Sequence, residues 1–103
     1  MLAMISQPMG YIDESIILET KKTATEYLKS LGYDVLDTYF DFYPDKDVKN
    51  DGVFYLAKSL ECLSKCDLLY MCKGWEEKNG CVIEHITALR YGIDIEYEGG
   101  VKR

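Results

Sequence analysis

The sequence lacks the features by which several classes of protein are identified. Its 103 residues contain no dense run of lysine and arginine, and the net charge is −6. Because the backbones of nucleic acids are bound mainly by clustered Lys and Arg, extended DNA or RNA is not an expected partner. The first ten residues, MLAMISQPMG, have neither a basic n-region nor a long apolar segment. We therefore expect no signal peptide and no membrane span, and we predict a cytoplasmic protein.

Metal-binding and disulfide motifs are also missing. None of the four cysteines belongs to a C-x-x-C pair, and with one histidine the spacing of a zinc site is absent. We expect buried, reduced thiols at Cys62, Cys66, Cys72 and Cys81. The stretch DFYPDKDVKND has four aspartates between residues 41 and 51 but lacks the glycine and distal glutamate of a calcium loop. A solvated loop is therefore favoured over a metal site, and we predict neither a metal nor a cofactor.

Short apolar runs alternate along the chain with amphipathic stretches. The apolar runs predict strands at residues 2–6, 33–40, 67–72 and 93–97. The amphipathic stretches predict helices at residues 13–32, 53–66 and 80–91, the first capped by Asp13 and ended by Gly32. Strands that are apolar throughout indicate a parallel sheet that is covered on both faces. We predict one domain over residues 1–103, a doubly wound, Rossmann-like or flavodoxin-like α/β domain of three layers with a four-stranded parallel sheet in the order 2-1-3-4.

In such sheets, ligands bind beyond the carboxyl ends of the strands, near the point where the strand order reverses. Three segments are expected there: SQPMG (6–10), TYFDFYP (38–44) and KGWEEKNG (73–80). The first has a single glycine and does not match G-x-G-x-x-G, which argues against a dinucleotide site. Its backbone amides could still form a loose cradle for a sugar or a phosphate.

Glu84 is the leading candidate for chemistry. It lies near the start of the third predicted helix, where the helix dipole favours an anion. Helical periodicity places Glu84 almost opposite an apolar face made of Val82, Ile86 and Leu89. Periodicity alone therefore predicts a carboxylate that faces solvent. The same side of the helix also carries Cys81, Ala88 and Tyr91, so a second subunit could cover it.

Five further residues are candidates for the site or for structural roles. Trp75 could cap the end of the sheet or stack on a base. His85 is expected to be a structural histidine with a satisfied ring, and Asp67 a structural or capping acid. Lys58 and Ser59 could reach the ligand crevice from the second helix, which the sequence leaves open.

The segments ISQPMG, YLAKSLECLSKCDLLYMCKGWEEKNGCVIEHITALRYG and IDIE follow one another in an order that resembles a known group. The chain is similar, from Met4 to Glu96, to the nucleoside 2-deoxyribosyltransferase-like superfamily. In particular, it resembles a short branch that is common in bacterial and phage genomes and largely without assigned function. The most specific pattern is D-x-x-Y, then G-W, then G-x-x-x-E-x-x-x-A-x-x-x-G. Its positions here are Asp67, Tyr70, Gly74, Trp75, Gly80, Glu84, Ala88 and Gly92.

The resemblance implies that Glu84 attacks the anomeric carbon of a 2-deoxynucleoside. A covalent deoxyribosyl-enzyme would form, which another base or water resolves. The resemblance also implies a homodimer or larger homo-oligomer whose sites are completed by the neighbouring chain. Two positions depart from the pattern: Ser59 stands where the superfamily has an acid for the leaving base, and Ala3 where it has a tyrosine that orients the glutamate. Substitutes for that tyrosine could be Tyr39, Tyr55 or Tyr70.

The predicted function is cleavage or transfer at the N-glycosidic bond of a (deoxy)nucleoside or its monophosphate. The alternative, favoured by Ser59 and Ala3, is a non-catalytic protein that binds or sequesters a nucleotide-like small molecule. A structural subunit with a vestigial site is a third possibility. With Glu84 as the catalytic residue, the predicted ligand-binding residues are Ser6, Gln7, Pro8, Met9, Gly10, Tyr39, Phe40, Lys58, Ser59, Gly74, Trp75, Asn79 and Gly80.

Overall fold

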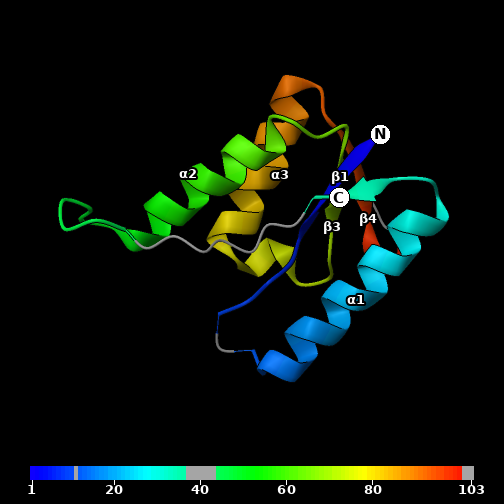
Figure 1. The fold of residues 1–103 in the computed structure, drawn as a ribbon, viewed down its shortest axis with the longest axis horizontal. Coiled ribbons are helices and arrows are strands. Elements are labelled where there is room, and N and C mark those ends of the chain that lie inside the picture. The colour runs from blue at the N-terminus through cyan, green and yellow to red at the C-terminus, as the bar shows by residue number, and fades with distance from the viewer. Residues whose placement is uncertain (11, 37–43, 101–103) are drawn as a thin grey trace.

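A computed structural model of the chain describes residues 1–10, 12–36 and 44–100 (Figure 1). Strands and helices alternate in the order β1 (Leu2–Ser6), α1 (Glu14–Ser30), β2 (Asp34–Val35), α2 (Asp51–Leu63), β3 (Leu68–Met71), η1 (Trp75–Glu77), α3 (Asn79–Tyr91), β4 (Asp94–Tyr97) and η2 (Glu98–Gly100). The four strands form one parallel sheet in the order β2-β1-β3-β4. This confirms the predicted fold class, including the strand order.

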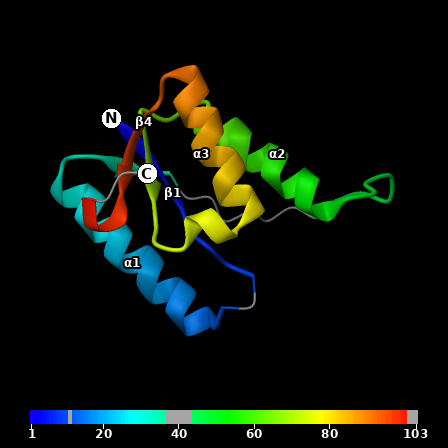
Figure 2. The same ribbon diagram turned by 180° about the vertical axis from the view of Figure 1, so that it is seen from behind.

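The helices cover the two faces of the sheet unequally. Helix α1 packs on one face, while α2 and α3 lie side by side on the other (Figures 1 and 2). None of the helices that the structure describes is long and apolar enough to cross a membrane. The sheet therefore has a layer of helix on each side, as predicted. The layer formed by α2 and α3 includes the helix that carries Glu84.

The ends of the first helix follow from local chemistry. The Asp13 carboxylate accepts a hydrogen bond from the backbone N–H of Ser15 at 3.0 Å, which satisfies one of the free donors at a helix start and lowers the pKa of Asp13. At the other end, Gly32 has a φ of +93°, a conformation that glycine adopts without the strain other residues incur. Both predicted boundary residues are confirmed.

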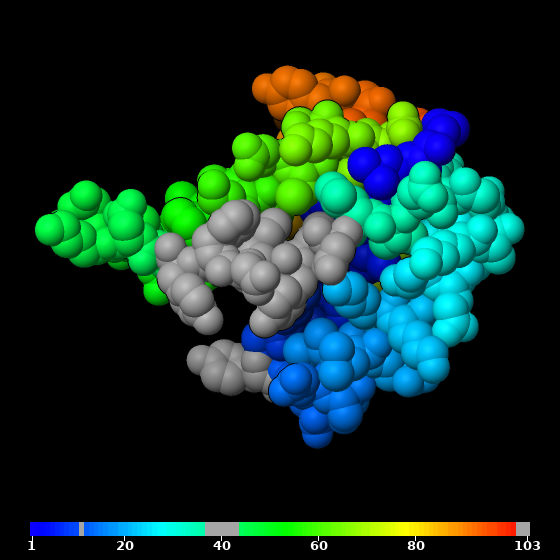
Figure 3. Space-filling model, in the orientation of Figure 1, coloured from blue at the N-terminus to red at the C-terminus, as the bar shows by residue number. Residues whose placement is uncertain are grey.

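Helix α2 differs most from the prediction. It begins at Asp51, two residues before the predicted start, because the Asn50 side chain caps it by accepting a hydrogen bond from Val53 N at 3.0 Å. It ends at Leu63 rather than residue 66. Residues 44–50 project from the body of the molecule with Asp45 and Asp47 exposed, as a solvated loop would be (Figure 3). Strand β2 covers two residues of the predicted 33–40, and residues 37–43 lie outside the described part.

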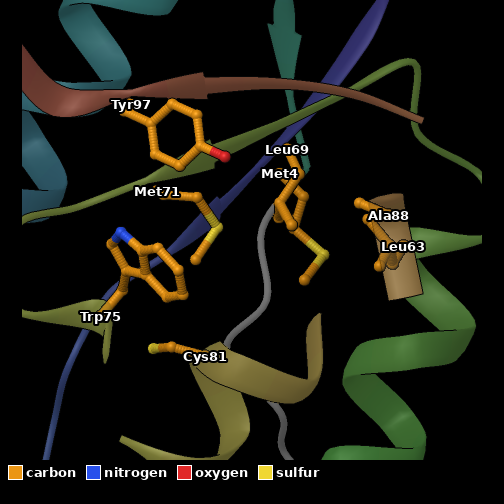
Figure 4. Close-up of a cluster of buried hydrophobic side chains, with 8 residues drawn as sticks. All are labelled: Met4, Leu63, Leu69, Met71, Trp75, Cys81, Ala88 and Tyr97. Carbon is orange, nitrogen blue, oxygen red and sulfur yellow. The ribbon is translucent and has the colours of Figure 1, made fainter. Parts of the chain in front are cut away.

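Alternating side chains divide the core into two clusters. Between the sheet and the α2–α3 layer lie Met4, Leu63, Leu69, Met71, Trp75, Cys81, Ala88 and Tyr97 (Figure 4). Between the sheet and α1 lie Ala3, Ile5, Ala24, Leu28, Leu68, Tyr70 and Cys72. All four residues of β3 are buried, which is what a central strand covered on both faces requires.

Leu69 tests how much this core contributes to stability. The side chain is completely buried at the centre of β3, so truncation leaves a cavity that the rigid sheet cannot close. Leu69→Ala is expected to lower the free energy of unfolding by about 3 kcal/mol, measured by urea denaturation. The matched control Leu18→Ala, at an exposed position of α1, is expected to change it by less than about 0.5 kcal/mol. Equal losses in the two variants would contradict this description of the core.

Candidate functional site

The Glu84 side chain is directed into the molecule. It is 8% exposed, and its Oε1 accepts a hydrogen bond from the Ser6 hydroxyl at 2.6 Å. Ser6 is the last residue of β1, so the carboxylate lies at the carboxyl edge of the sheet, next to the strand where the order reverses. The prediction from periodicity, a solvent-facing carboxylate, is wrong.

Periodicity predicted the wrong orientation because α3 buries the side that carries Glu84 and exposes its apolar side. Its buried residues are Cys81, Glu84, His85 and Ala88. Its apolar side is 38 to 59% exposed and consists of Val82, Ile83, Ile86 and Leu89, which we call the apolar stripe of α3. This orientation is tolerated because each buried polar side chain has a partner: Glu84 bonds to Ser6, and the His85 ring nitrogen Nε2 lies 2.6 Å from the Tyr97 hydroxyl.

The electrostatics of Glu84 are those of a buried carboxylate without a counter-ion. Burial raises its pKa above the ordinary value, and hydrogen bonds from the Ser6 and Ser59 hydroxyls oppose part of that rise. Among the described residues, no salt bridge neutralises it. Holding a carboxylate in this way costs folding free energy, and such costs are concentrated at functional sites.

Ser59 lies on α2, and its hydroxyl forms a hydrogen bond with the Glu84 carboxylate. The sequence had left open whether Ser59 reaches the site from this helix. Lys58 is half-buried, with its ammonium 5.7 Å from the centre of the Phe54 ring. The structure therefore brings Ser59 to the carboxylate.

Ala3 is not positioned to orient Glu84. It is buried on the face that α1 covers, and Tyr70 belongs to the same cluster, whereas α3 packs on the opposite face. A side chain at either position would point away from the carboxylate, because successive residues of a strand face opposite sides. The residue of β1 that meets Glu84 is Ser6. Sequence reasoning placed Ser6 in the ligand cradle and missed this contact, although its position three residues after Ala3 indicates the opposite face.

Cys81 is a further neighbour that the prediction did not include in the site. It lies one turn before Glu84 on the buried side of α3. The Cys81 thiol also forms a side-chain hydrogen bond with Ser6. Burial raises the pKa of the Cys81 thiol. Its signal in the sequence was the spacing of three residues from Glu84, which puts both on one side of a helix.

The SQPMG loop contains residues with different environments. Gln7 is buried and its side-chain amide donates a hydrogen bond to the Ile17 carbonyl at 3.0 Å, so it ties the loop to α1. Pro8 is half-buried, and Met9 and Gly10 are exposed. The structure thus leaves Met9 and Gly10 open at the surface, while the Gln7 amide already has a partner.

The loop before α3 lies against the SQPMG loop. The Lys78 ammonium donates a hydrogen bond to the Gly10 carbonyl at 3.1 Å. Gly74 has a φ of +88°, and a β-carbon there would approach Cγ of Pro8 to 3.4 Å, so glycine suits both the turn and the approach. Asn79 and Gly80 form the exposed N-terminus of α3. These predicted ligand residues are brought together, and Tyr39 and Phe40 lie outside the described residues.

Trp75 is placed in the core, where Figure 4 shows its indole beside Met71 and above Cys81. It is 8% exposed and stacks on the His85 ring with 4.1 Å between ring centres. Because one face of the indole is covered by His85, it offers little surface to a base. This placement corresponds to the cap over the sheet end rather than to the stacking platform.

The remaining candidates have structural roles. The Asp67 carboxylate accepts a hydrogen bond from the backbone N–H of Leu2 at 2.8 Å, and His85 is satisfied by Tyr97, as predicted. All four cysteines are free thiols, and burial raises the pKa of Cys66 to about 11 and that of Cys72 to about 12. The described residues contain no group of His, Cys, Asp and Glu that could hold a metal ion.

Comparison with known proteins gives one match. A family model described as a domain of unknown function, DUF4406, matches residues 9–97, from the SQPMG loop to the end of β4. The matched segment contains Ser59 and Glu84 and begins after Ser6. A search of curated proteins found no match. Because the matched segment spans most of the sequence, the chain belongs to the DUF4406 family.

Proposed function

We propose that the protein acts on the N-glycosidic bond of a (deoxy)nucleoside or nucleoside monophosphate, with Glu84 as the nucleophile. The observation that carries the proposal is the buried Glu84 carboxylate at the carboxyl edge of the sheet, held at 2.6 Å by the Ser6 hydroxyl. The resemblance to the nucleoside 2-deoxyribosyltransferase-like superfamily assigns the nucleophile to this same residue. A fixed carboxylate suits the chemistry because it can capture an oxocarbenium-like carbon and leave again.

The reaction has two steps. A Glu84 carboxylate oxygen bonds to the anomeric carbon while the bond to the base nitrogen breaks, and the base leaves with the electron pair and takes up a proton from solvent. A second base or a water molecule then attacks the same carbon and releases Glu84. Ser6 and Ser59 hold the carboxylate in place during both steps.

The loops around Glu84 suit the rest of such a ligand. The exposed N-terminus of α3, at Asn79 and Gly80, has free backbone N–H groups, and the dipole of this 13-residue helix attracts a phosphate or a sugar oxygen. The exposed Met9 and Gly10 lie near this helix start, where Lys78 donates a hydrogen bond to the Gly10 carbonyl. A nucleoside monophosphate would thus have its phosphate near the helix start and its anomeric carbon near Glu84.

The second candidate function is binding without turnover. Ser59, whose hydroxyl cannot serve as the acid for a leaving base, stands beside Glu84 and bonds to its carboxylate. The raised pKa of Glu84 also extends its protonated form to higher pH, and a protonated carboxyl binds a sugar hydroxyl but is a poor nucleophile. These two observations favour a protein that holds a nucleotide-like molecule intact.

Incubation with a panel of 2-deoxynucleosides and their monophosphates, with and without an acceptor base, separates the two functions. Release of free base by the wild-type protein, detected by chromatography, is expected for the enzyme. Thermal stabilisation by a panel member without base release is expected for the binder. Glu77→Ala, an exposed acid in η1, is the matched control and should leave either result unchanged.

We also propose a cytoplasmic homodimer that forms through the apolar stripe of α3. Four partly exposed aliphatic side chains on one helix side form a contiguous surface of the kind that is buried at subunit contacts. The free state of all four cysteines suits a reducing compartment. The stripe lies on the exposed side of α3, so a second chain there packs on the side of the helix that faces away from the buried Glu84.

A further inference from the structure

A groove lies on the other face of the sheet, away from Glu84. Its volume is about 620 Å³, within the range of small-molecule sites. Residues of α1, β3, β4 and η2 line it, and the part of the groove used below consists of Glu19, Tyr27, Tyr70, Glu96 and Glu98. We call it the α1–β4 groove. Figure 2 shows the end of β4 and η2 beside α1, where this groove is formed.

The groove exists because one helix has to cover four strands. Helix α1 packs on β1, β2 and β3, and β4 lies at the edge of the sheet beyond β3. At its far rim the chain turns through Gly99 and Gly100, both with φ above +70°, so that η2 closes the groove at the end of β4.

The polar groups in the groove include the phenol of Tyr70. Tyr70 is 6% exposed, and its hydroxyl forms no hydrogen bond with a residue that the structure describes. The Tyr27 hydroxyl donates to the Glu96 carboxylate, and the two tyrosine rings lie 5.7 Å apart. No fully buried side-chain nitrogen or oxygen among the described residues lacks a partner, so the Tyr70 oxygen opens into the groove, where a ligand can bond to it.

The charged residues that line the groove are acidic, and the Lys73 side chain lies against its rim at Gly99. Glu19, Glu96 and Glu98 contribute carboxylates, and no lysine or arginine is found among the described residues of its lining. Glu98 is held by the backbone N–H of Lys73 at 3.0 Å, and Glu96 by Tyr27, so two of the carboxylates are fixed in position. Fixed carboxylates beside aromatic rings select organic cations and repel nucleotides.

We propose that the α1–β4 groove binds a small organic cation with two or more ammonium groups joined by an aliphatic chain. One ammonium donates hydrogen bonds to the Glu96 carboxylate and the Tyr70 oxygen, and another lies near Glu98 or Glu19. The methylene chain packs on the ring faces of Tyr27 and Tyr70. The net charge of −6 raises the local concentration of such a cation.

Calorimetric titration with 1,4-diaminobutane and spermidine, against 1,4-butanediol, tests the proposal. Both amines are expected to bind with one site per chain at 150 mM salt, and the diol is expected not to bind. Tyr70→Phe, which deletes only the hydroxyl, is expected to weaken binding about fivefold, the effect of one hydrogen bond. Glu96→Gln keeps an acceptor for Tyr27 and removes a charge, so a loss of about tenfold is expected.

Matched controls separate a built site from general attraction to an acidic protein. Glu26→Gln removes an exposed carboxylate from α1 outside the groove, and Tyr91→Phe removes an exposed phenol from α3, so both should bind like the wild type. In an NMR titration, the backbone signals of Gly99 and Gly100 should shift. Equal weakening by Glu26→Gln and Glu96→Gln, or equal binding of the diol, would overturn the proposal.

The site is independent of the proposed function. Glu84→Gln lies on the opposite face of the sheet and should leave amine binding unchanged. Loss of amine binding in that variant would place the cation at Glu84 and refute the assignment to the groove. Absence of base release from nucleosides, by contrast, would not bear on it.

Discussion

Replacement of Glu84 by glutamine is expected to abolish base release and, at neutral pH, to make the protein more stable. The amide keeps the shape of the side chain and can still accept the hydrogen bond from Ser6, but it cannot form the glycosyl ester. Loss of a nucleophile that defines the mechanism lowers the rate by about 10⁴-fold or more. A carboxylate buried without a counter-ion destabilises the fold, and the neutral amide removes that cost.

The stability effect depends on pH in a direction that the raised pKa determines. Because the pKa of Glu84 in the folded protein lies above the unfolded value of 4.5, the folded state binds the proton more tightly than the unfolded state. The wild type should therefore lose stability as the pH rises from about 4.5 through the raised pKa, and the variant should not. The difference in melting temperature should be near zero below pH 4.5 and largest above the folded pKa.

Two matched measurements make this prediction specific. Thermal unfolding between pH 4 and 8 is compared for the wild type, Glu84→Gln and the exposed control Glu77→Gln, whose stability curve should follow that of the wild type. Base release, if Glu84 is the nucleophile, should increase with pH as the carboxylate ionises. A variant that is less stable than the wild type at pH 7 would contradict the burial of an unneutralised charge, and full activity in it would exclude Glu84 as the nucleophile.

Replacement of Ile86 by aspartate is expected to convert the proposed dimer into a monomer. Ile86 lies in the middle of the apolar stripe of α3 and is 47% exposed in the single chain. Burial of each aliphatic side chain contributes about 1.5–3 kcal/mol, and an aspartate at the centre of the contact removes one such contribution and adds a charge to be desolvated. The dissociation constant should rise by about 100-fold or more, since 1.4 kcal/mol corresponds to a factor of ten.

Sedimentation equilibrium on the wild type, Ile86→Asp and Leu18→Asp tests this prediction. Leu18 is 58% exposed on α1, so its variant introduces the same charge at an equally exposed aliphatic position outside the stripe. The control should remain dimeric with an unchanged circular dichroism spectrum, and Ile86→Asp should have the mass of one chain. A wild type that is monomeric at 100 μM would disprove the dimer, as would dissociation of both variants.

The sheet could be predicted from sequence because its information is local. Uniformly apolar runs such as the one at β3 and boundary residues such as Asp13 and Gly32 act within a few residues, and crossover handedness limits the strand order. The capping of α2 by Asn50 was not predicted. Several polar residues of the preceding loop could cap the helix, and the sequence does not show where the helix axis begins. Boundaries of this kind depend on a single hydrogen bond.

The site could be predicted only in part, for a different reason. Strand ends located the SQPMG loop, Gly74 and the start of α3 correctly, because topology alone brings them together. The orientation of α3 could not be predicted, because a helix with an apolar stripe can direct it either to its own sheet or to another surface. Periodicity does not distinguish these two cases, and Glu84 was assigned to the wrong environment for that reason.

Strand β3 separates two chemically different compartments with neighbouring residues. Tyr70 belongs to the cluster under α1 and lines the acidic groove, while the next residue, Met71, belongs to the cluster that contains Trp75 and Cys81. The two clusters lie on opposite faces of this strand, and its backbone separates them. Because β3 is paired in fixed register with β1 and β4, its backbone holds both clusters in place, and each face keeps its own chemistry.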